Sequence, residues 1–181
     1  MHLELDTVVW MPAGVPPHRE VEDDPGPEAR YEMCELTIAG DERFSLSRLE
    51  IDRAGPSYMA DTLRELRAAS PDDELFLLLG GDQAASLRSW HEPEEVLSLA
   101  TIAVVERSGW PRPAIGVTLS GLRGAERLRF FEMPRIDISS SMIRRRAREG
   151  KPIRYLVTDK VANYIGAQSL YGASTPVAAE T

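Results

Sequence analysis

The sequence predicts an α/β fold, Rossmann-like, in which helices cover both faces of a parallel sheet. Strand-sized apolar runs alternate along the chain with segments of helical periodicity, which is the pattern of a parallel sheet. The 181 residues are 43% hydrophobic and 28% charged, which suits one globular domain with a core. No apolar run approaches the roughly 18 residues that a membrane helix needs, and no secretory signal is visible. A soluble, cytoplasmic protein that does not bind membranes is therefore expected.

The first elements follow from apolar runs and turn residues. A buried strand is predicted at 7–11, because the run ends in a Pro-Ala-Gly turn. A helix is predicted at 27–40, since Pro27 suits the first helical turn and a glycine lies at the other end. Apolar and polar residues alternate at 44–51, which indicates a strand with one covered face.

The alternation continues through the rest of the chain. After a helix at 61–69, the most apolar segment predicts a strand at 74–79, and Gly80, Gly81 and Asp82 then indicate a loop where backbone can approach a ligand. The remaining elements are a helix at 93–99, a strand at 101–105, a helix at 115–122, a strand at 128–133 and helices at 141–149 and 158–167. Ligands of open α/β sheets bind beyond the carboxyl ends of the strands, so the chemistry is expected in the loops there.

Cysteine and histidine give no sign of a metal centre. Cys34 is the single cysteine, and its position in an apolar helical stripe predicts a buried thiol. The histidines His2, His18 and His91 are far apart and show no zinc-like spacing. No protein-held metal is expected.

The charge distribution favours a small anionic ligand. The net charge of -8 argues against a nucleic-acid-binding surface. However, eight basic and three acidic residues lie between Arg135 and Lys160, giving that segment a net charge of +5. Such a segment on an acidic protein suits a nucleotide phosphate, although a solvated helix face is the alternative.

A serine-rich motif lies inside this basic segment. Ser139, Ser140 and Ser141 follow Ile138 at the expected start of a helix, where amides and hydroxyls can bind phosphate. Arg144 lies one turn further on, where its guanidinium can reach the same anion. A plain serine cap on a basic helix is the alternative.

Five short motifs follow one another along the chain in a fixed order. The first three are WMPAGVPPHR at 10–19, GPSYMADTL at 55–63, and GGD at 80–82 with WH at 90–91. The last two are ISSSMIR at 138–144 and IRYLV at 153–157. Taken together, they resemble motifs of the bacterial nicotinate-nucleotide adenylyltransferases of the HIGH-type nucleotidyltransferase superfamily, whose ISSTxIR is similar to the segment at 138–144. The resemblance extends from about Leu5 to Tyr171.

The resemblance implies transfer of AMP from ATP to nicotinate mononucleotide, with Mg²⁺ entering with ATP and deamido-NAD and pyrophosphate as products. By position, Ser140, Ser141 and Arg144 would hold the ATP phosphates, with Arg144 the catalytic group. The residues implied for the mononucleotide are Trp90 on the pyridine ring with Tyr58 and Met59 beside it, Gly81 and Asp82 at a ribose, and His18 and Arg19 near the phosphate.

Two departures from the family pattern bear on this expectation. Met59 stands where the family usually has threonine, so a hydroxyl expected near the nicotinate carboxylate is absent. The family's opening GGTFDPxHxGH segment, whose histidines face the ATP phosphates, does not occur in the 181 residues. We therefore expect the first strand and first helix to be missing and the true start to lie upstream of Met1.

The domain expectation and the alternatives follow from the same resemblance. A nucleotidyltransferase domain is expected at 1–171, with a disordered tail at 172–181. One alternative is a shortened, non-catalytic nucleotide-binding module. Another is a related adenylyltransferase that acts on nicotinamide mononucleotide or phosphopantetheine, and association of identical chains is left open.

Overall fold

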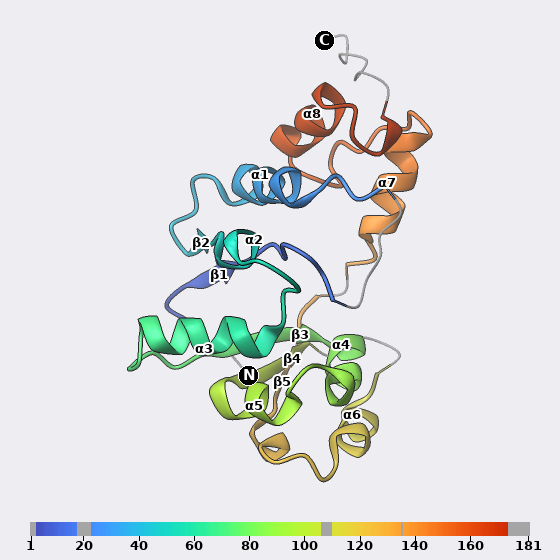
Figure 1. Cartoon of the computed structure of the whole chain (residues 1–181). Coiled ribbons are helices and arrows are strands. Elements are labelled where there is room, and N and C mark those ends of the chain that lie inside the picture. The colour runs from blue at the N-terminus through green and yellow to red at the C-terminus, as the bar shows by residue number, and fades with distance from the viewer. Residues whose placement is uncertain (1–2, 18–22, 106–109, 135, 174–181) are drawn as a thin grey trace. The chain divides into compact units, whose positions relative to one another are not determined.

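A computed structural model describes residues 3–17, 23–105, 110–134 and 136–173. The chain divides into two compact units. The middle unit contains residues 57–105 and 110–134, with residues 3 and 4. The flanking unit contains residues 5–17, 23–56 and 136–173. Both are built from parallel strands flanked by helices, so the predicted α/β class is confirmed (Figure 1).

The flanking unit contains a two-stranded parallel sheet. Strand β1 (Val8–Trp10) pairs with β2 (Phe44–Leu46), with Val9 opposite Ser45. The helices of this unit are α1 (Pro27–Ile38), α2 (Leu49–Asp52), α7 (Ser140–Arg148) and α8 (Asp159–Ala167), followed by a 3-10 turn at Leu170–Gly172.

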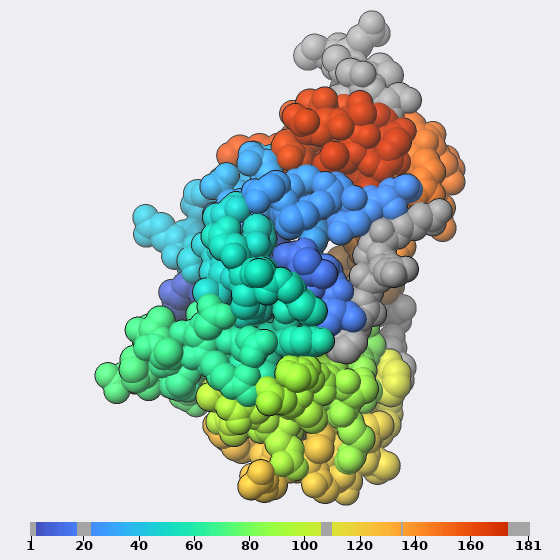
Figure 2. All heavy atoms as spheres, in the orientation of Figure 1, coloured from blue at the N-terminus to red at the C-terminus, as the bar shows by residue number. Residues whose placement is uncertain are grey.

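The core of the flanking unit brings α1 together with the last helices of the described chain. Helix α1 contacts α8, and both α7 and α8 contact the 3-10 turn that follows, so these segments lie against one another (Figure 2). The buried apolar residues of this core are Ile143, Ala147, Ile153, Val161, Ile165 and Ala173.

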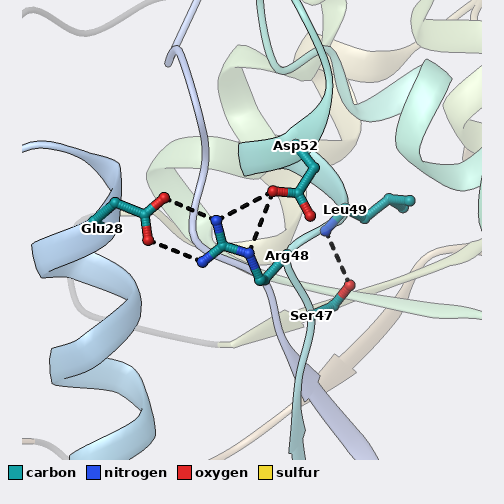
Figure 3. Close-up of polar contacts among 5 residues, drawn as sticks. All are labelled: Glu28, Ser47, Arg48, Leu49 and Asp52. Carbon is teal, nitrogen blue, oxygen red and sulfur yellow. Dashed lines mark hydrogen bonds and ion pairs between the residues drawn. The ribbon is translucent and has the colours of Figure 1, made fainter.

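A charged contact links α1 to α2 in the same unit. The Arg48 guanidinium donates to both carboxylate oxygens of Glu28, over 2.8 and 2.9 Å, and to Oδ1 of Asp52 (Figure 3). It also lies 4.9 Å from the ring centroid of Tyr31. These contacts fix the N-terminal turn of α1 beside α2.

The middle unit is organised around a three-stranded parallel sheet. Strands β3 (Phe76–Gly80) and β5 (Arg129–Phe131) pair with β4 (Thr101–Val105) between them. The helices of this unit are α3 (Met59–Ala69), α4 (Gly81–Ser86), α5 (Pro93–Leu99) and α6 (Arg112–Leu119), with 3-10 turns at Leu87–Ser89 and Ala125–Arg127.

Strand β4 is the centre of the middle unit's core. Ile102, Ala103 and Val104 are fully buried, whereas Leu78 on the edge strand β3 is 39% exposed. Helix α3 contacts α5, and α4 contacts α6. The order of elements along the chain therefore agrees with the predicted alternation.

The predicted strand at 44–51 is wrong in its second half. The strand ends at Leu46, and α2 begins at Leu49. Ser47 Oγ accepts a hydrogen bond from the Leu49 amide over 3.2 Å, which starts a helical turn after the strand. Glu50, in the first turn of α2, is only 4% exposed.

Two further local predictions need correction. The loop expected after β3 is absent, because α4 begins at Gly81 directly after the strand. Cys34 is half-buried and not a core residue, although its burial still raises the pKa of the thiol. Strand β1 is also less buried than predicted, since Val9 is 47% exposed.

Ordered structure continues past the expected boundary at Tyr171. Gly172 completes a 3-10 turn and Ala173 is buried. The rest of the expected tail, 174–181, lies outside the described residues. Over the described parts of the chain, no helix has the length and apolar character needed to cross a membrane.

Candidate functional site

The serine motif forms the N-terminus of α7. Ser139 is the N-cap, and its Oγ accepts a hydrogen bond from the Met142 amide over 3.1 Å. Ser140 and Ser141 occupy the first turn and are exposed. The amides of a first turn have no acceptor inside the helix, so this end can bind an anion.

Arg144 lies beside this end of the helix. Its Nη2 donates to Ser141 Oγ over 3.2 Å, and the side chain is half-buried. The structure thus brings Ser140, Ser141 and Arg144 onto one turn. A guanidinium and an exposed helix N-terminus together form an electropositive site suited to phosphate.

Other basic side chains of α7 contact the protein itself. Arg146 donates twice to the Pro152 carbonyl oxygen, over 2.7 and 2.9 Å. Arg148 forms an ion pair with Asp23. Both lie in the last turn, where positive charge complements the carbonyl end of the helix. The basic segment is therefore neither a uniform solvated face nor a single anion site.

The segment after β1 packs closely against α1 and α2. The Arg30 guanidinium donates to the carbonyl oxygens of Ala13 and Gly14, over 2.6 and 3.1 Å. A Cβ added to Gly14 would lie 2.2 Å from the Glu50 carbonyl oxygen, so only glycine fits this approach. His18 and Arg19, which the resemblance implies for the mononucleotide, lie outside the described residues.

Tyr171 shares the electrostatic surroundings of α1 and α7. Burial raises the pKa of its phenol, while the guanidinium groups of Arg144 and Arg30 act in the opposite direction. The carboxylate of Asp24 raises the pKa further. The charges of Arg144, Arg30 and Asp24 therefore all act on the phenol of Tyr171.

Aromatic residues gather in the middle unit. The rings of Tyr58 and His91 stack with centroids 4.3 Å apart and an interplanar angle of 30°. Trp90 is half-buried against the core, and its Nε1 donates to Ser86 Oγ over 3.2 Å. Ser86, in the missed helix α4, could not be identified from the sequence, whereas His91 stands next to Trp90 in the WH pair.

A charged network surrounds this aromatic group. Arg64 pairs with Asp61 of α3, with Glu92 just before α5 and with Glu95 of α5, and its Nη1 lies 2.8 Å from Asp61 Oδ1. The hydrogen bond from Arg64 lowers the pKa of Glu92. Glu92 also lies 3.6 Å from Nε2 of His91. The network holds the residue after His91, whose φ of 50° is left-handed, at the start of α5.

The other predicted residues of the middle unit begin its helices. Met59 is the first residue of α3, directly after Tyr58, and packs against the core. Gly81 and Asp82 form the first turn of α4, and a Cβ added to Gly81 would lie 2.8 Å from Cβ of Trp110. Asp82 is exposed, so its carboxylate is accessible to a ligand.

Resident metal ligands do not gather in the described parts of either unit. Among residues 3–17, 23–105, 110–134 and 136–173, no group of three or more histidine, cysteine or acidic side chains could hold a metal ion.

Comparisons with known proteins assign the chain to a family. The cytidylyltransferase-like family model matches residues 1–146. A probable nicotinate-nucleotide adenylyltransferase of Geobacillus thermodenitrificans is 39% identical over 180 residues, covering 97% of this chain and 77% of that protein. The corresponding protein of Thermus thermophilus is 42% identical over 167 residues, covering 92% of this chain and 84% of that protein.

A solved structure agrees with these matches at the level of the fold. Plasmodium falciparum nicotinic acid mononucleotide adenylyltransferase complexed with NaAD aligns with a TM-score of 0.73 at 16% sequence identity. The alignment covers 94% of this chain and 84% of that one. The chain belongs to the nicotinate-nucleotide adenylyltransferase family of the cytidylyltransferase-like proteins.

Proposed function

We propose that this chain transfers AMP from ATP to nicotinate mononucleotide, giving deamido-NAD and pyrophosphate. The observation that carries this proposal is 39–42% identity to nicotinate-nucleotide adenylyltransferases over more than nine-tenths of the chain. The serine motif with Arg144 supports the ATP half of the reaction, because an exposed helix N-terminus beside a guanidinium suits a polyphosphate.

The chemistry requires positioning and neutralisation of charge. A phosphate oxygen of the mononucleotide attacks the α-phosphorus of ATP, and a new P–O bond forms as the bond to pyrophosphate breaks. No covalent bond to the protein is needed. Arg144 is the proposed catalytic group, since its positive charge would stabilise the charge developing on the leaving pyrophosphate.

We assign the ligand groups to residues on this basis. Ser140, Ser141 and Arg144 hold the phosphates of ATP, which brings Mg²⁺ with it as part of the substrate. The remaining assignments concern the mononucleotide, with Trp90, Tyr58 and Met59 at the pyridine ring, Gly81 and Asp82 at the ribose, and His18 and Arg19 at the phosphate. The aromatic surface around Trp90 supports the pyridine assignment.

The test is a product assay with three acceptors. Nicotinate mononucleotide, nicotinamide mononucleotide and phosphopantetheine are each incubated with MgATP and the chain, and dinucleotide and pyrophosphate are quantified. We expect equal amounts of deamido-NAD and pyrophosphate from the nicotinate acceptor, and loss of both when EDTA removes the metal. A preference for either other acceptor would reject the proposed substrate.

Calorimetry separates the enzyme from a binding module. The 181-residue chain and a chain extended by the reading frame upstream of Met1 are titrated with ATP and with nicotinate mononucleotide. Binding without pyrophosphate release from either chain would support a non-catalytic module and reject the proposed transferase.

A pair of α7 variants tests the ATP assignment. Arg144→Ala is expected to weaken ATP binding by about tenfold or more, because a charge-assisted contact is lost. Arg145→Ala, an exposed arginine of the same helix, is the matched control and should leave binding within about twofold. Unchanged ATP affinity in a folded Arg144→Ala variant would remove Arg144 from the site.

A further inference from the structure

The pair Trp90 and His91 is anchored on its N-terminal side by the 3-10 turn that precedes it. Leu87, the first residue of that turn, is fully buried, and its carbonyl oxygen accepts a hydrogen bond from the Trp90 amide over 3.1 Å. The indole Nε1 of Trp90 donates to Ser86 Oγ over 3.2 Å. These contacts hold Trp90 to the part of the chain that comes before it.

Glu92 fixes the chain on the other side of the pair. Its backbone is left-handed, with φ of 50° and ψ of 59°, a conformation that is unfavourable for residues other than glycine. Its carbonyl oxygen accepts hydrogen bonds from the Glu95 and Val96 amides, each over 3.1 Å, and α5 begins there. The course of the chain next to His91 therefore depends on how Glu92 is held.

The side chain of Glu92 is held by Arg64 of α3. Nη2 of Arg64 donates to Oε2 of Glu92, and Nε lies 3.4 Å from Oε1 of Glu95. The guanidinium is itself oriented within α3, because Nη1 donates to Oδ1 of Asp61 over 2.8 Å. A planar guanidinium can meet three carboxylates in fixed directions, which the single ammonium group of lysine cannot reproduce.

A second, separate contact joins the same two segments. Tyr58, the N-cap of α3, stacks on His91 with ring centroids 4.3 Å apart. Arg64 lies further along α3 and pairs with the residue that follows His91. The side chains of Arg64 and Glu92 are 40% and 46% exposed, so their ion pair adds little to the stability of the whole chain. Its effect is expected in the local geometry of the turn.

We infer that Arg64 is a positioning residue for the mononucleotide, which acts through Glu92 to orient Trp90 and His91 for the pyridine ring. This inference rests on the proposed function, in which Trp90 stacks on that ring. Arg64 touches no reacting atom. Without its contact to Glu92 the turn would adopt more conformations in the free protein, and restricting them again on binding would weaken the affinity.

The test compares Arg64→Ala and Arg64→Lys with a matched control. Arg123→Ala removes an arginine that pairs with Glu94, in the first turn of the same helix α5, and whose side chain is 89% exposed. For each protein, kcat and both KM values are measured, and the Kd for nicotinate mononucleotide is obtained by calorimetry. Urea unfolding is followed, and hydrogen exchange is recorded for a peptide covering 86–96.

Arg64→Ala is expected to raise KM and Kd for nicotinate mononucleotide by about fivefold or more, with kcat and the KM for ATP within about twofold of the original values. Exchange in the 86–96 peptide should quicken by about fivefold or more, because the turn loses its anchor. The urea midpoint should change little. Arg64→Lys should recover only part of the affinity, and Arg123→Ala should change none of these quantities.

A double-mutant cycle tests whether Arg64 acts through Glu92. Glu92→Ala should weaken the mononucleotide as much as Arg64→Ala does, and the two changes together should weaken it by no more than about twofold beyond either alone. Losses that multiply would overturn the inference, because Arg64 would then act by another route. Glu92→Ala also leaves Arg64 in place, so it gives the answer if Arg64→Ala does not fold.

Two further outcomes would overturn the inference. One is unchanged affinity for the mononucleotide in folded Arg64→Ala or Glu92→Ala. The other is an equal loss of affinity for both substrates, which a merely destabilised chain would give.

The readouts also separate this inference from the proposed function. If the original chain neither binds nicotinate mononucleotide nor forms deamido-NAD, the proposed function fails. Hydrogen exchange on the ligand-free variants still decides whether Arg64 holds the turn, and an unchanged exchange rate in Arg64→Ala would reject that role.

Discussion

Trp90 is half-buried against the core of the middle unit, and its indole is oriented by a hydrogen bond to Ser86. The adjacent His91 stacks on Tyr58, so two motifs that are distant in the sequence meet here. A large aromatic side chain held in this way loses little conformational entropy when a ring stacks on it. Its contribution to binding can be separated from its contribution to packing.

We predict that Trp90→Ala weakens nicotinate mononucleotide binding by about tenfold or more, since a stacking surface is lost. Trp90→Phe should keep most of the affinity because a ring remains. Ser86→Ala removes only the partner of the indole N–H and should have an intermediate effect. Calorimetry with the mononucleotide measures all three, and equal affinity for Trp90→Ala and the original chain would contradict the stacking role.

Position 14 requires glycine, because the backbone there lies very close to the backbone of Glu50. Gly14→Ala is predicted to lower the free energy of unfolding by about 1–3 kcal/mol, because the new Cβ would meet the Glu50 carbonyl oxygen at 2.2 Å. Urea titration measures the change. Gly116→Ala is the control, since nothing lies within 4 Å of the added Cβ and alanine favours the helix, so equal or greater stability is expected there.

At the scale of elements, α7 and α8 are capped in the same way. Ser139 Oγ accepts from the Met142 amide over 3.1 Å, and Thr158 Oγ1 accepts from the Val161 amide over 3.3 Å. The two caps therefore form a matched pair within the flanking unit, and only the first lies beside the proposed phosphate site.

Ser139→Ala and Thr158→Ala are each predicted to lower the free energy of unfolding by about 1 kcal/mol, because a capping hydrogen bond is lost. Only Ser139→Ala should also weaken ATP binding, since the cap orders the first turn of α7. Urea titration and ATP calorimetry on both variants test this. Equal ATP affinities would show that the cap of α7 is structural alone.

Side chains on β4 are more deeply buried than those on β3, so truncating a side chain on β4 is expected to lower the free energy of unfolding by more. Ile102→Ala is predicted to lower the free energy of unfolding by about 2–5 kcal/mol, because Ile102 is 0% exposed. Leu78→Ala on β3 should cost much less, since Leu78 is 39% exposed. Urea titration compares the two, and similar losses would contradict the central position of β4.

At the scale of the whole molecule, ion pairs act on stability in acid. Hydrogen bonds from arginine or lysine lower the pKa of Glu28, Glu92, Glu94 and Glu149, and Arg43 lowers that of Asp41 to about 2. A carboxyl whose pKa is lower in the folded state binds fewer protons there than in the unfolded chain. Its contribution to stability is fully present at a pH above its pKa in the unfolded chain, and it is lost as the pH falls through its pKa in the folded state.

We predict that the urea midpoint is steady at neutral pH and declines as the pH falls below about 4.5, continuing towards about 2 through Asp41. Glu28→Gln should flatten the upper part of this decline, because one titrating group is gone. In alkali the dependence of stability on pH has the opposite direction, since burial raises the pKa of Cys34 and Tyr171 in the folded state. Stability should therefore also fall as the pH rises through those values, and a flat profile in both directions would contradict these assignments.

The sequence predicted an element correctly where the spacing of apolar residues fitted only a helix or only a strand and turn residues marked both of its ends. The segments at 93–99 and 101–105 are a helix and a strand with the predicted bounds. The alternation at 44–51 predicted one continuous strand, which was wrong. The hydrogen bond from the Leu49 amide to Ser47 Oγ begins a helical turn, and Glu50 is buried in that helix. Glycines at 80–81 suggested a loop, whereas contacts within the middle unit stabilise helix α4 directly after the strand.

By itself, the sequence determined the α/β class, the order of most elements and the motifs that carry the family resemblance, because periodicity, turn residues and short motifs are local properties. Only the tertiary structure decided which residues hold those motifs in place. The contacts of Arg30 with Ala13 and Gly14, of Arg148 with Asp23, and of Tyr58 with His91 join residues far apart in the chain. Such contacts depend on how elements pack, and no local pattern encodes them.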